Sequence, residues 1–335
     1  MTIIHFIIVL GTAVMTFGLL VVVQPRLGQF ALVHPNPRSS HKAPTPQGGG
    51  IVIIATTVLV TAAAMFFPSA AVTDAGTLAW VLGATVMLAI VGAVDDFQAI
   101  AAVPRLVAQI LAVIVVLGTL PAELRIVQTL PWWLERGLLL VGGVWFVNVV
   151  NFMDGIDWMT VSEVVPLTAG LALFGAMGAL PYSATIAALA ICGATIGFAP
   201  FNRPVARLFL GDVGSLPIGL LLTWLLILLA GNGHLAAALL LPLYYLADAT
   251  ITLLRRLANG EPILQAHRRH FYQRAVDSGA GIYGVIGRVF IINIALVALA
   301  TLTVLTPSRL AQAAAVAAGF SLVGLLLFHF ARGRR

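Results

Sequence analysis

The feature that most constrains the fold of this chain is a series of long apolar segments. A bilayer core of roughly 30 Å needs about 20 apolar residues in one helix. Eleven segments of the 335 residues approach that length, without the alternation typical of a membrane-spanning strand. Because only helices satisfy their own backbone hydrogen bonds in lipid, the sequence predicts an all-α, polytopic integral membrane protein of about 11 transmembrane helices. The segments are 3–23, 50–67, 78–94, 105–120, 137–151, 161–178, 184–199, 213–230, 235–254, 284–305 and 310–330.

The low charge content excludes most classes of soluble protein. Only 9% of the residues are charged and 60% are hydrophobic, whereas a soluble domain carries roughly 25% charged residues. So few charges cannot cover a surface exposed to water, so the partner of that surface is the lipid bilayer and no nucleic acid is expected. The segment 1–23 lacks a basic leader and a cleavage site, so we interpret it as a retained span.

The distribution of basic residues predicts the orientation of the helices. With the N-terminus outside, fifteen of the eighteen basic residues lie in cytoplasmic segments, and only Arg125, Arg136 and Arg309 lie outside. Cytoplasmic loops are enriched in lysine and arginine, so we expect an N-out, C-in topology. The whole chain, 1–335, is expected to form one membrane domain. Its cytoplasmic catalytic loops are predicted at 24–50, 95–104, 151–160, 199–213 and 255–283.

Acidic residues stand at two boundaries between an apolar segment and a cytoplasmic loop. Asp95 and Asp96 follow one segment, and two carboxylates this close favour splitting their pKa values or sharing a cation. Asp212 precedes another segment, where it is either an N-cap or, with its neighbouring glycines, part of an anion site. The glycines 48–50 are open to the same anion-binding interpretation, although a glycine triplet alone is weak evidence.

A third polar group recurs at every third residue. Asn148, Asn151, Asp154 and Asp157 would line one stripe of a helix or of a slightly tightened turn. The alternative role of this group is a polar helix cap. Together with the carboxylates above, it is expected to converge on one face of the membrane, as a catalytic site on a helical scaffold requires.

The last cytoplasmic loop carries His267, Arg268, Arg269 and His270. The two histidines would share a helix face, so a zinc pair is one alternative. The carboxylates and amides elsewhere favour a hard cation, and we expect Mg²⁺, with Mn²⁺ as a substitute, held by one or two side chains and substrate phosphates. The arginines would clamp anionic oxygens, although an inside-positive topology also explains some of them. Asp248 lies within an apolar segment and needs a partner or a polar cavity.

The order of these motifs resembles that of the polyprenyl-phosphate N-acetylhexosamine-1-phosphate transferases, often called glycosyltransferase family 4. The resemblance implies transfer of a sugar 1-phosphate, an N-acetylhexosamine, from a UDP-sugar to undecaprenyl phosphate with release of UMP. It is closest to the enzymes that initiate lipopolysaccharide O-antigen, which implies cell-envelope polysaccharide synthesis at the bacterial inner membrane. A homodimer is one alternative for the oligomeric state. The motifs are Pro44 to Gly49, Asp95-Asp96, Asn148 to Asp157, Gly211 to Ser215 and the His267/His270 loop, with Ser39 to His41 and Ala266 to Gln273 favouring the O-antigen branch.

The resemblance also implies roles for individual residues. The Mg²⁺ ligands would be Asn151 and Asp212. The catalytic residues would be Lys42, Asp95, Asp96 and His270, of which Asp95 would remove or position the proton of the lipid phosphate. The substrate-binding residues would be Asn148, Asp154, Asp157, His267, Arg268 and Arg269.

The sequence departs from the family pattern at several positions and leaves a rival function open. Gln47 replaces a frequent arginine, and Trp158 stands where glycine usually follows the last aspartate. A secondary transporter is the main rival, since many spans and an intramembrane Asp248 are common in transporters. Transporters place polar residues near the midplane, whereas this chain is expected to gather them on one face. An inactive scaffold is the third alternative.

Overall fold

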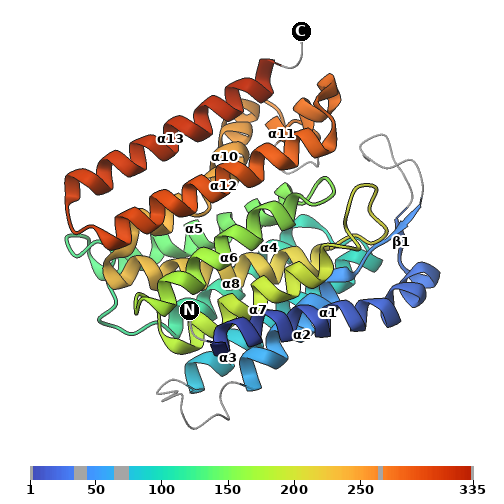
Figure 1. Cartoon of the computed structure of the whole chain (residues 1–335), viewed down its shortest axis with the longest axis horizontal. Helices are drawn as coiled ribbons and strands as arrows, with labels where there is room; N and C mark the ends of the chain where they lie inside the picture. Colours follow the sequence, from blue (N-terminus) through green and yellow to red (C-terminus); the bar gives the residue numbers. More distant parts are fainter. Residues whose placement is uncertain (1–2, 34–43, 64–74, 263–266, 333–335) are drawn as a thin grey trace.

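The computed structural model describes residues 3–33, 44–63, 75–262 and 267–332, and these form a bundle of helices (Figure 1). The predictions for Lys42 and for Ser39 to His41 lie outside the described residues. Two short strands pair antiparallel, β1 (Leu32–Val33) and β2 (Thr45–Pro46). The helices are α1 (Ile3–Phe30), α2 (Gly49–Ala63), α3 (Ala75–Phe97), α4 (Ala102–Gly118), α5 (Trp132–Met153), α6 (Met159–Ala176), α7 (Tyr182–Phe198), α8 (Asp212–Leu229), α9 (Leu235–Leu240), α10 (Leu243–Ala258), α11 (Phe271–Ala275), α12 (Ile282–Leu305) and α13 (Arg309–Arg332).

Seven helical stretches in the described part of the chain are long and apolar enough to cross a membrane. They are α1, α3, α5, α6, the stretch from α8 into α9, α12 and α13, and the shorter apolar helices are α2, α4 and α7. The chain is therefore a polytopic membrane protein, and within the described residues each of the eleven predicted segments overlaps helical structure.

One segment that was predicted as a single helix forms two helices. The segment 235–254 is divided into α9 and α10, and Pro242 is the residue that precedes α10. Proline has no backbone N–H and clashes with the preceding turn, so it ends a helix on its N-terminal side. In contrast, α5 continues without a break through the glycine pair at 142–143. Gly143 faces Val113 and Thr223, which leave little room for a side chain there.

The centre of the bundle is α8, whose residues from Val213 to Leu229 are all buried. A helix that is apolar all round is stable only when it is enclosed, and α8 packs against α2, α3, α4 and α5. Figure 1 shows α12 and α13 side by side on one flank of the bundle and α1, α2 and α3 on the other. Large apolar side chains on these outer helices, such as Ile291 and Leu325, remain exposed, as expected for surfaces that contact lipid.

The glycines at 48–50 serve helix packing, so the anion-binding interpretation of this triplet is wrong. The backbone N–H groups of Gly49 and Gly50 donate to the carbonyl oxygens of Phe209 and Leu210, both at 2.9 Å. A Cβ atom on Gly50 would collide with Gly214 in the first turn of α8. The donors that an anion would need are thus used to attach the start of α2 to the segment that leads into α8.

Candidate active site

The site forms where the end of α3 meets the beginning of α8. Asp96 accepts hydrogen bonds from the backbone N–H groups of Asp212 (2.8 Å) and Val213 (3.1 Å). The first N–H groups of a helix have no partner within it, so Asp96 caps α8 from a neighbouring helix. The N-cap residue is Gly211, whose φ of +77° lies in the region that favours glycine. The alternative that Asp212 is the N-cap is therefore wrong.

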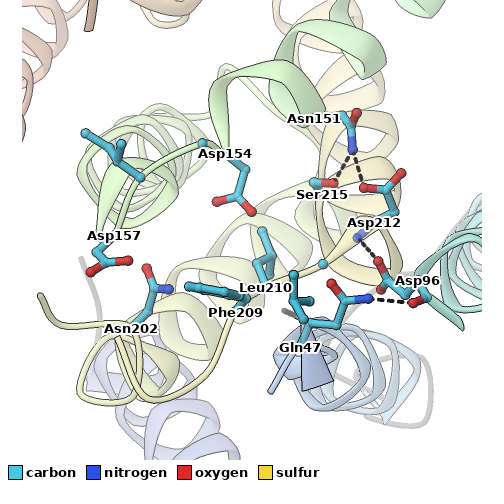
Figure 2. A pocket seen from close by; sticks show the side chains of 14 residues that line it. Gln47, Asp96, Asn151, Asp154, Asp157, Asn202, Phe209, Leu210, Asp212 and Ser215 are labelled. Carbon is cyan, nitrogen blue, oxygen red and sulfur yellow. Dashed lines mark hydrogen bonds between the residues drawn. The ribbon is translucent and has the colours of Figure 1, made fainter. Parts of the chain in front are cut away.

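The carboxylate of Asp212 joins residues from three other helices. The side-chain amide of Asn151 donates to Asp212 Oδ1 (2.8 Å) and to Ser215 Oγ (2.9 Å), as Figure 2 shows. Arg105, from α4, forms ion pairs with Asp212 Oδ2 (3.2 Å) and with Asp95 Oδ2 (2.7 Å). These contacts bring Asp95, Asn151 and Asp212 together, and their place on one face of the membrane stays a prediction.

Arg105 is a site residue that the sequence analysis missed, because there it counted only toward the orientation of the helices. Its signal in the sequence is the short connection between Asp95 and the first turn of α4. The backbone N–H of Ile100 donates to Asp95 Oδ1 (2.6 Å), which folds this connection back on the carboxylate. A cation at the start of α4 is thereby brought beside the acidic cluster.

A cavity of about 240 Å³ opens beside this cluster (Figure 2). Five of the predicted site residues line it, and four of those are aspartates. Among its described lining residues there is no lysine or arginine. Gln47, Asn202 and Phe209 also line it and were not predicted as site residues. The five predicted residues are Asp96, Asn151, Asp154, Asp157 and Asp212.

The predicted helical stripe of polar residues is wrong beyond its first half. Helix α5 ends at Met153, so Asp154 and Asp157 lie in the connection to α6. The hydroxyl of Thr160 donates to Asp154, and Asp157 accepts from the backbone N–H of Ala206 (3.0 Å).

Asn148 lies one turn back on α5 and does not line the cavity. Its amide donates to the side-chain oxygen of Gln109 (2.5 Å) and to the carbonyl of Val144 (2.8 Å). Because Gln109 belongs to α4, Asn148 connects α4 to α5 in this structure.

The backbone conformation at Trp158 explains why glycine is usual at this position in the family. Its φ is +59°, a backbone conformation that glycine adopts without cost and other residues rarely adopt. The indole N–H of Trp158 donates to the carbonyl of Ala199 (2.6 Å), and its backbone N–H donates to Asn202 Oδ1 (2.8 Å). These bonds hold the wall of the cavity between Asp157 and α6.

Burial raises the pKa of Asp154 from its ordinary value of 3.8 to about 7, and the nearby charges of Asp212 and Asp157 act in the same direction. The hydrogen bond from Thr160 opposes this shift. The cavity thus favours a proton on Asp154 unless a cation compensates its charge.

Asp154 should therefore make stability depend on pH. Between about pH 4 and pH 7 the folded chain holds a proton that the unfolded chain has lost, so the contribution of Asp154 to stability falls as the pH rises through this window. We expect a difference of about 1–2 kcal/mol across it, given that the group lies at a cavity wall. Melting temperatures of detergent-purified protein measure the slope. Asp154→Asn should flatten it, and an equal slope in both proteins would contradict the assignment.

The histidine and arginine cluster lies beside the cavity and does not line it. Tyr272 connects the two, because its hydroxyl donates to the carbonyl of Phe152 (3.2 Å) at the end of α5. The rings of His267 and His270 stack with their centroids 4.9 Å apart. Burial and the neighbouring His270 lower the pKa of His267 to about 4, so at neutral pH this ring offers hydrogen bonds and not positive charge.

Asp248, which the sequence places within an apolar segment, has its partners in this same cluster. It accepts from the backbone N–H groups of Phe271 (3.0 Å) and Tyr272 (3.2 Å) and contacts His270 Nδ1 (3.2 Å). A carboxylate in that position attaches α11 to α10. The two cluster arginines pair with acidic residues, Arg268 with Asp277 (2.9 Å) and Arg269 with Glu261.

The helices that build the cavity carry the sequence of a known family. The profile described as Glycosyl transferase family 4 matches residues 78–230, which run from α3 through α8. This range includes Asp95, Asp96, Asn151 and Asp212. This part of the chain is therefore similar to glycosyltransferase family 4.

Three relatives illustrate the similarity of this chain to other proteins. It is 25% identical over 221 residues to a probable undecaprenyl-phosphate N-acetylglucosaminyl 1-phosphate transferase of Bacillus subtilis, covering 63% of this chain and 61% of that protein. It is 27% identical over 287 residues to a decaprenyl-phosphate N-acetylglucosaminephosphotransferase of Mycobacterium tuberculosis, covering 76% and 70%. It is 30% identical over 149 residues to a phospho-N-acetylmuramoyl-pentapeptide-transferase of Lactococcus lactis, covering 40% and 45%. The chain thus spans less than two thirds of the Bacillus protein.

The oxygen-bearing side chains of the cavity suit a hard cation. In the described part of the chain no three His, Cys, Asp or Glu side chains are arranged to hold a metal ion by themselves. Mg²⁺ does not need such a cage, because it keeps water and binds through one or two carboxylates and substrate phosphates. Asp212 and Asn151 are in contact at the cavity wall, and their side chains carry oxygen atoms of the kind that coordinate Mg²⁺. The aspartates around them leave an excess of negative charge for a cation to offset.

Proposed function

We propose that this chain transfers the 1-phosphate of an N-acetylhexosamine from a UDP-sugar to undecaprenyl phosphate, giving the polyprenyl-diphosphate sugar and UMP. The observation that carries the proposal is the cavity of four aspartates, in which Asn151 and Arg105 hold Asp212, within the range that matches the family. The N-acetylglucosaminyl names of the Bacillus and Mycobacterium relatives support the sugar class.

The reaction exchanges one phosphoanhydride for another. An oxygen of the lipid phosphate attacks the phosphorus bonded to the sugar, a new P–O–P bond forms, and the bond to UMP breaks. A phosphate monoester has a second pKa near 6 and is largely dianionic at pH 7, so the attack needs no strong general base. The greater barrier is the repulsion between two anions.

The residues around the cavity act on that repulsion. Mg²⁺, which Asp212 and Asn151 would hold, supplies charge neutralisation when bound. Arg105, which does not itself line the cavity, places a guanidinium next to Asp212. Asp154 and Asp157 are assigned to the uridine side, and Lys42, Asp95 and Asp96 to the lipid phosphate. His267, Arg268, Arg269 and His270 would contact the diphosphate and sugar from the neighbouring cluster.

We further propose an N-out, C-in topology of about 11 spans, with one membrane domain and a cytoplasmic active site. The support is the position of the charges. Arg105 pairs with the cavity residue Asp212, and Arg203 and Arg207 lie close to the lining residues Asn202 and Phe209 in the chain. In contrast, Arg125 lies on the connection between α4 and α5, and Arg309 is the first residue of α13. Cysteine labelling in intact cells, in a background without Cys192, tests this. Labelling of position 309 from outside and of position 203 only after permeabilisation is the expected result.

The direct test is incubation of the purified protein with undecaprenyl phosphate, Mg²⁺ and each of several UDP-N-acetylhexosamines. We expect UMP release together with a lipid product whose mass has increased by one sugar phosphate. UMP release without that lipid would contradict the acceptor. Substrate flux in proteoliposomes without product formation would favour the transporter instead.

Initiation of O-antigen or another envelope polysaccharide is proposed from the resemblance around Ala266 to Gln273. It is tested by loss of that polymer when the gene is deleted.

Asp95 is expected to act by positioning. Both carboxylate oxygens have partners, Ile100 N–H and Arg105, and the side chain is only 9% exposed. Asp95→Asn should therefore lower kcat/KM for the lipid phosphate by about 10–100-fold, through misplacement of Arg105, without moving the pH–rate profile. Steady-state kinetics over a range of pH measure both quantities. Loss of one limb of the profile would instead assign Asp95 as the base.

A further inference from the structure

A second hollow, of about 340 Å³, lies at the C-terminal end of α10 and shares no lining residue with the aspartate cavity. Four arginines and one glutamate line it, so it carries an excess of three positive charges. The aspartate cavity has the opposite charge, so the two hollows select different ligands. The charged lining residues are Arg255, Arg256, Glu261, Arg269 and Arg274.

The arginines of this basic pocket are held in place by surrounding contacts. Arg256 is only 4% exposed and pairs with Glu261 at 3.3 Å. Glu261 also pairs with Arg269. The guanidinium of Arg255 lies 4.7 Å from the ring centroid of Phe271, in a cation–π contact. One carboxylate among four guanidinium groups leaves charge for an anionic ligand, and arginine suits phosphate oxygens because its planar group donates in pairs.

The helix that carries the pocket is amphipathic at this end. Thr252, Arg255 and Arg256 line the pocket. At about 100° per residue, Leu254 and Leu257 fall on the other side of α10, where they are 57% and 58% exposed. The pocket thus lies at the end of a helix whose other side carries exposed leucines. A ligand with a phosphate at one end and acyl chains at the other matches both surfaces.

We propose that this basic pocket binds the phosphate headgroup of an anionic membrane phospholipid, whose acyl chains lie along the exposed leucines of α10. The lipid site does not depend on the proposed function. Arg269 is also assigned above to the diphosphate and sugar, whereas Arg255, Arg256 and Arg274 have no assigned role in the transfer reaction. Tyr272 and Asp248 lie between it and the aspartate cavity and attach α10 to α11. Lipid bound there would therefore stabilise the arrangement of these two helices.

The test uses full-length protein, delipidated in a nonionic detergent and titrated with phosphatidylglycerol, with lipid adducts counted by native mass spectrometry and no UDP-sugar present. The double variant Arg255→Gln/Arg274→Gln should weaken the first binding event by at least about tenfold. The matched control is Arg203→Gln/Arg288→Gln, which loses the same charge outside the pocket and should bind like the unmodified chain. Arg274→Gln alone, at an exposed side chain, keeps the Arg255–Phe271 contact and should still weaken binding.

Competition experiments distinguish a lipid headgroup from free phosphate and from a UDP-sugar as the ligand of the pocket. Binding of phosphatidylglycerol but not phosphatidylcholine, unaffected by millimolar inorganic phosphate, supports the proposal. Displacement of the lipid by inorganic phosphate would overturn it in favour of a free-phosphate site. Displacement by a UDP-sugar would overturn it by making the pocket part of the substrate site. If both double variants weaken lipid binding equally, the effect comes from net charge and not from the pocket, and this result would also overturn the proposal.

Discussion

Asp212→Asn is expected to lower kcat/KM for UMP release by on the order of 10³-fold, about 4 kcal/mol of transition-state stabilisation. The change keeps the size of the side chain and an oxygen that accepts from Asn151. It removes the negative charge that pairs with Arg105 at 3.2 Å and that would hold Mg²⁺. Initial rates measured against Mg²⁺ concentration check the result, because loss of a ligand should also raise the Mg²⁺ concentration that gives the half-maximal rate.

The control for this prediction is Glu123→Gln, which removes one negative charge from an exposed side chain far along the sequence from the cavity residues. It should leave kcat/KM within about twofold, as is usual for a surface change. The melting temperature of Asp212→Asn should stay close to that of the unmodified protein, because Asp96 bonds to the backbone of residue 212 and not to its side chain. Activity near that of the unmodified protein at limiting Mg²⁺ would refute the metal role.

The sequence predicted where helices occur better than how they meet. Continuous apolar segments determine the spans, because lipid permits no other backbone arrangement. The break at Pro242 was predictable from the missing N–H of proline, yet the surrounding hydrophobicity outweighed it in the sequence analysis. The contact between Gly50 and Gly214 was not predictable, because a glycine that allows close helix packing and one that leaves N–H groups open to an anion have the same sequence.

Some residues of the candidate site were likewise predictable from the sequence, and others depend on how the helices pack. Acidic and amide residues at the ends of apolar segments indicated Asn151 and Asp212, because such groups are costly within a membrane unless they share a polar cavity. Asp96 was predicted as catalytic, and the structure shows in addition that it caps α8 across the helix interface. That contact depends on tertiary packing. No sequence motif indicated Asn202, because its role in the site depends on hydrogen bonds to the backbones of Trp158 and Leu208.

Gly92→Val is the change expected to have the largest structural effect on the site. Gly92 lies on α3 one turn before Asp96, and a Cβ atom there would collide with the backbone of Asp212 and Val213. Backbone atoms cannot move aside as a flexible side chain can, so α3 must shift away from the start of α8. Overpacking of this kind costs about 1–3 kcal/mol or more, and the shift would also break the hydrogen bonds from Asp96. We expect a lower melting temperature and a loss of transfer activity of at least about 100-fold, since small misplacements of catalytic groups cost that much.

Gly83→Val is the matched control, because Gly83 lies on the same helix with no heavy atom within 4 Å of where its Cβ would be. It introduces the same β-branched side chain into α3, on a face exposed in the described structure. Activity and melting temperature should therefore stay near those of the unmodified protein. If both variants lose activity equally, the effect belongs to helix propensity along α3, and the contact between α3 and α8 is not what positions Asp96. If only Gly92→Val loses activity, the acidic site depends on how closely these two helices approach.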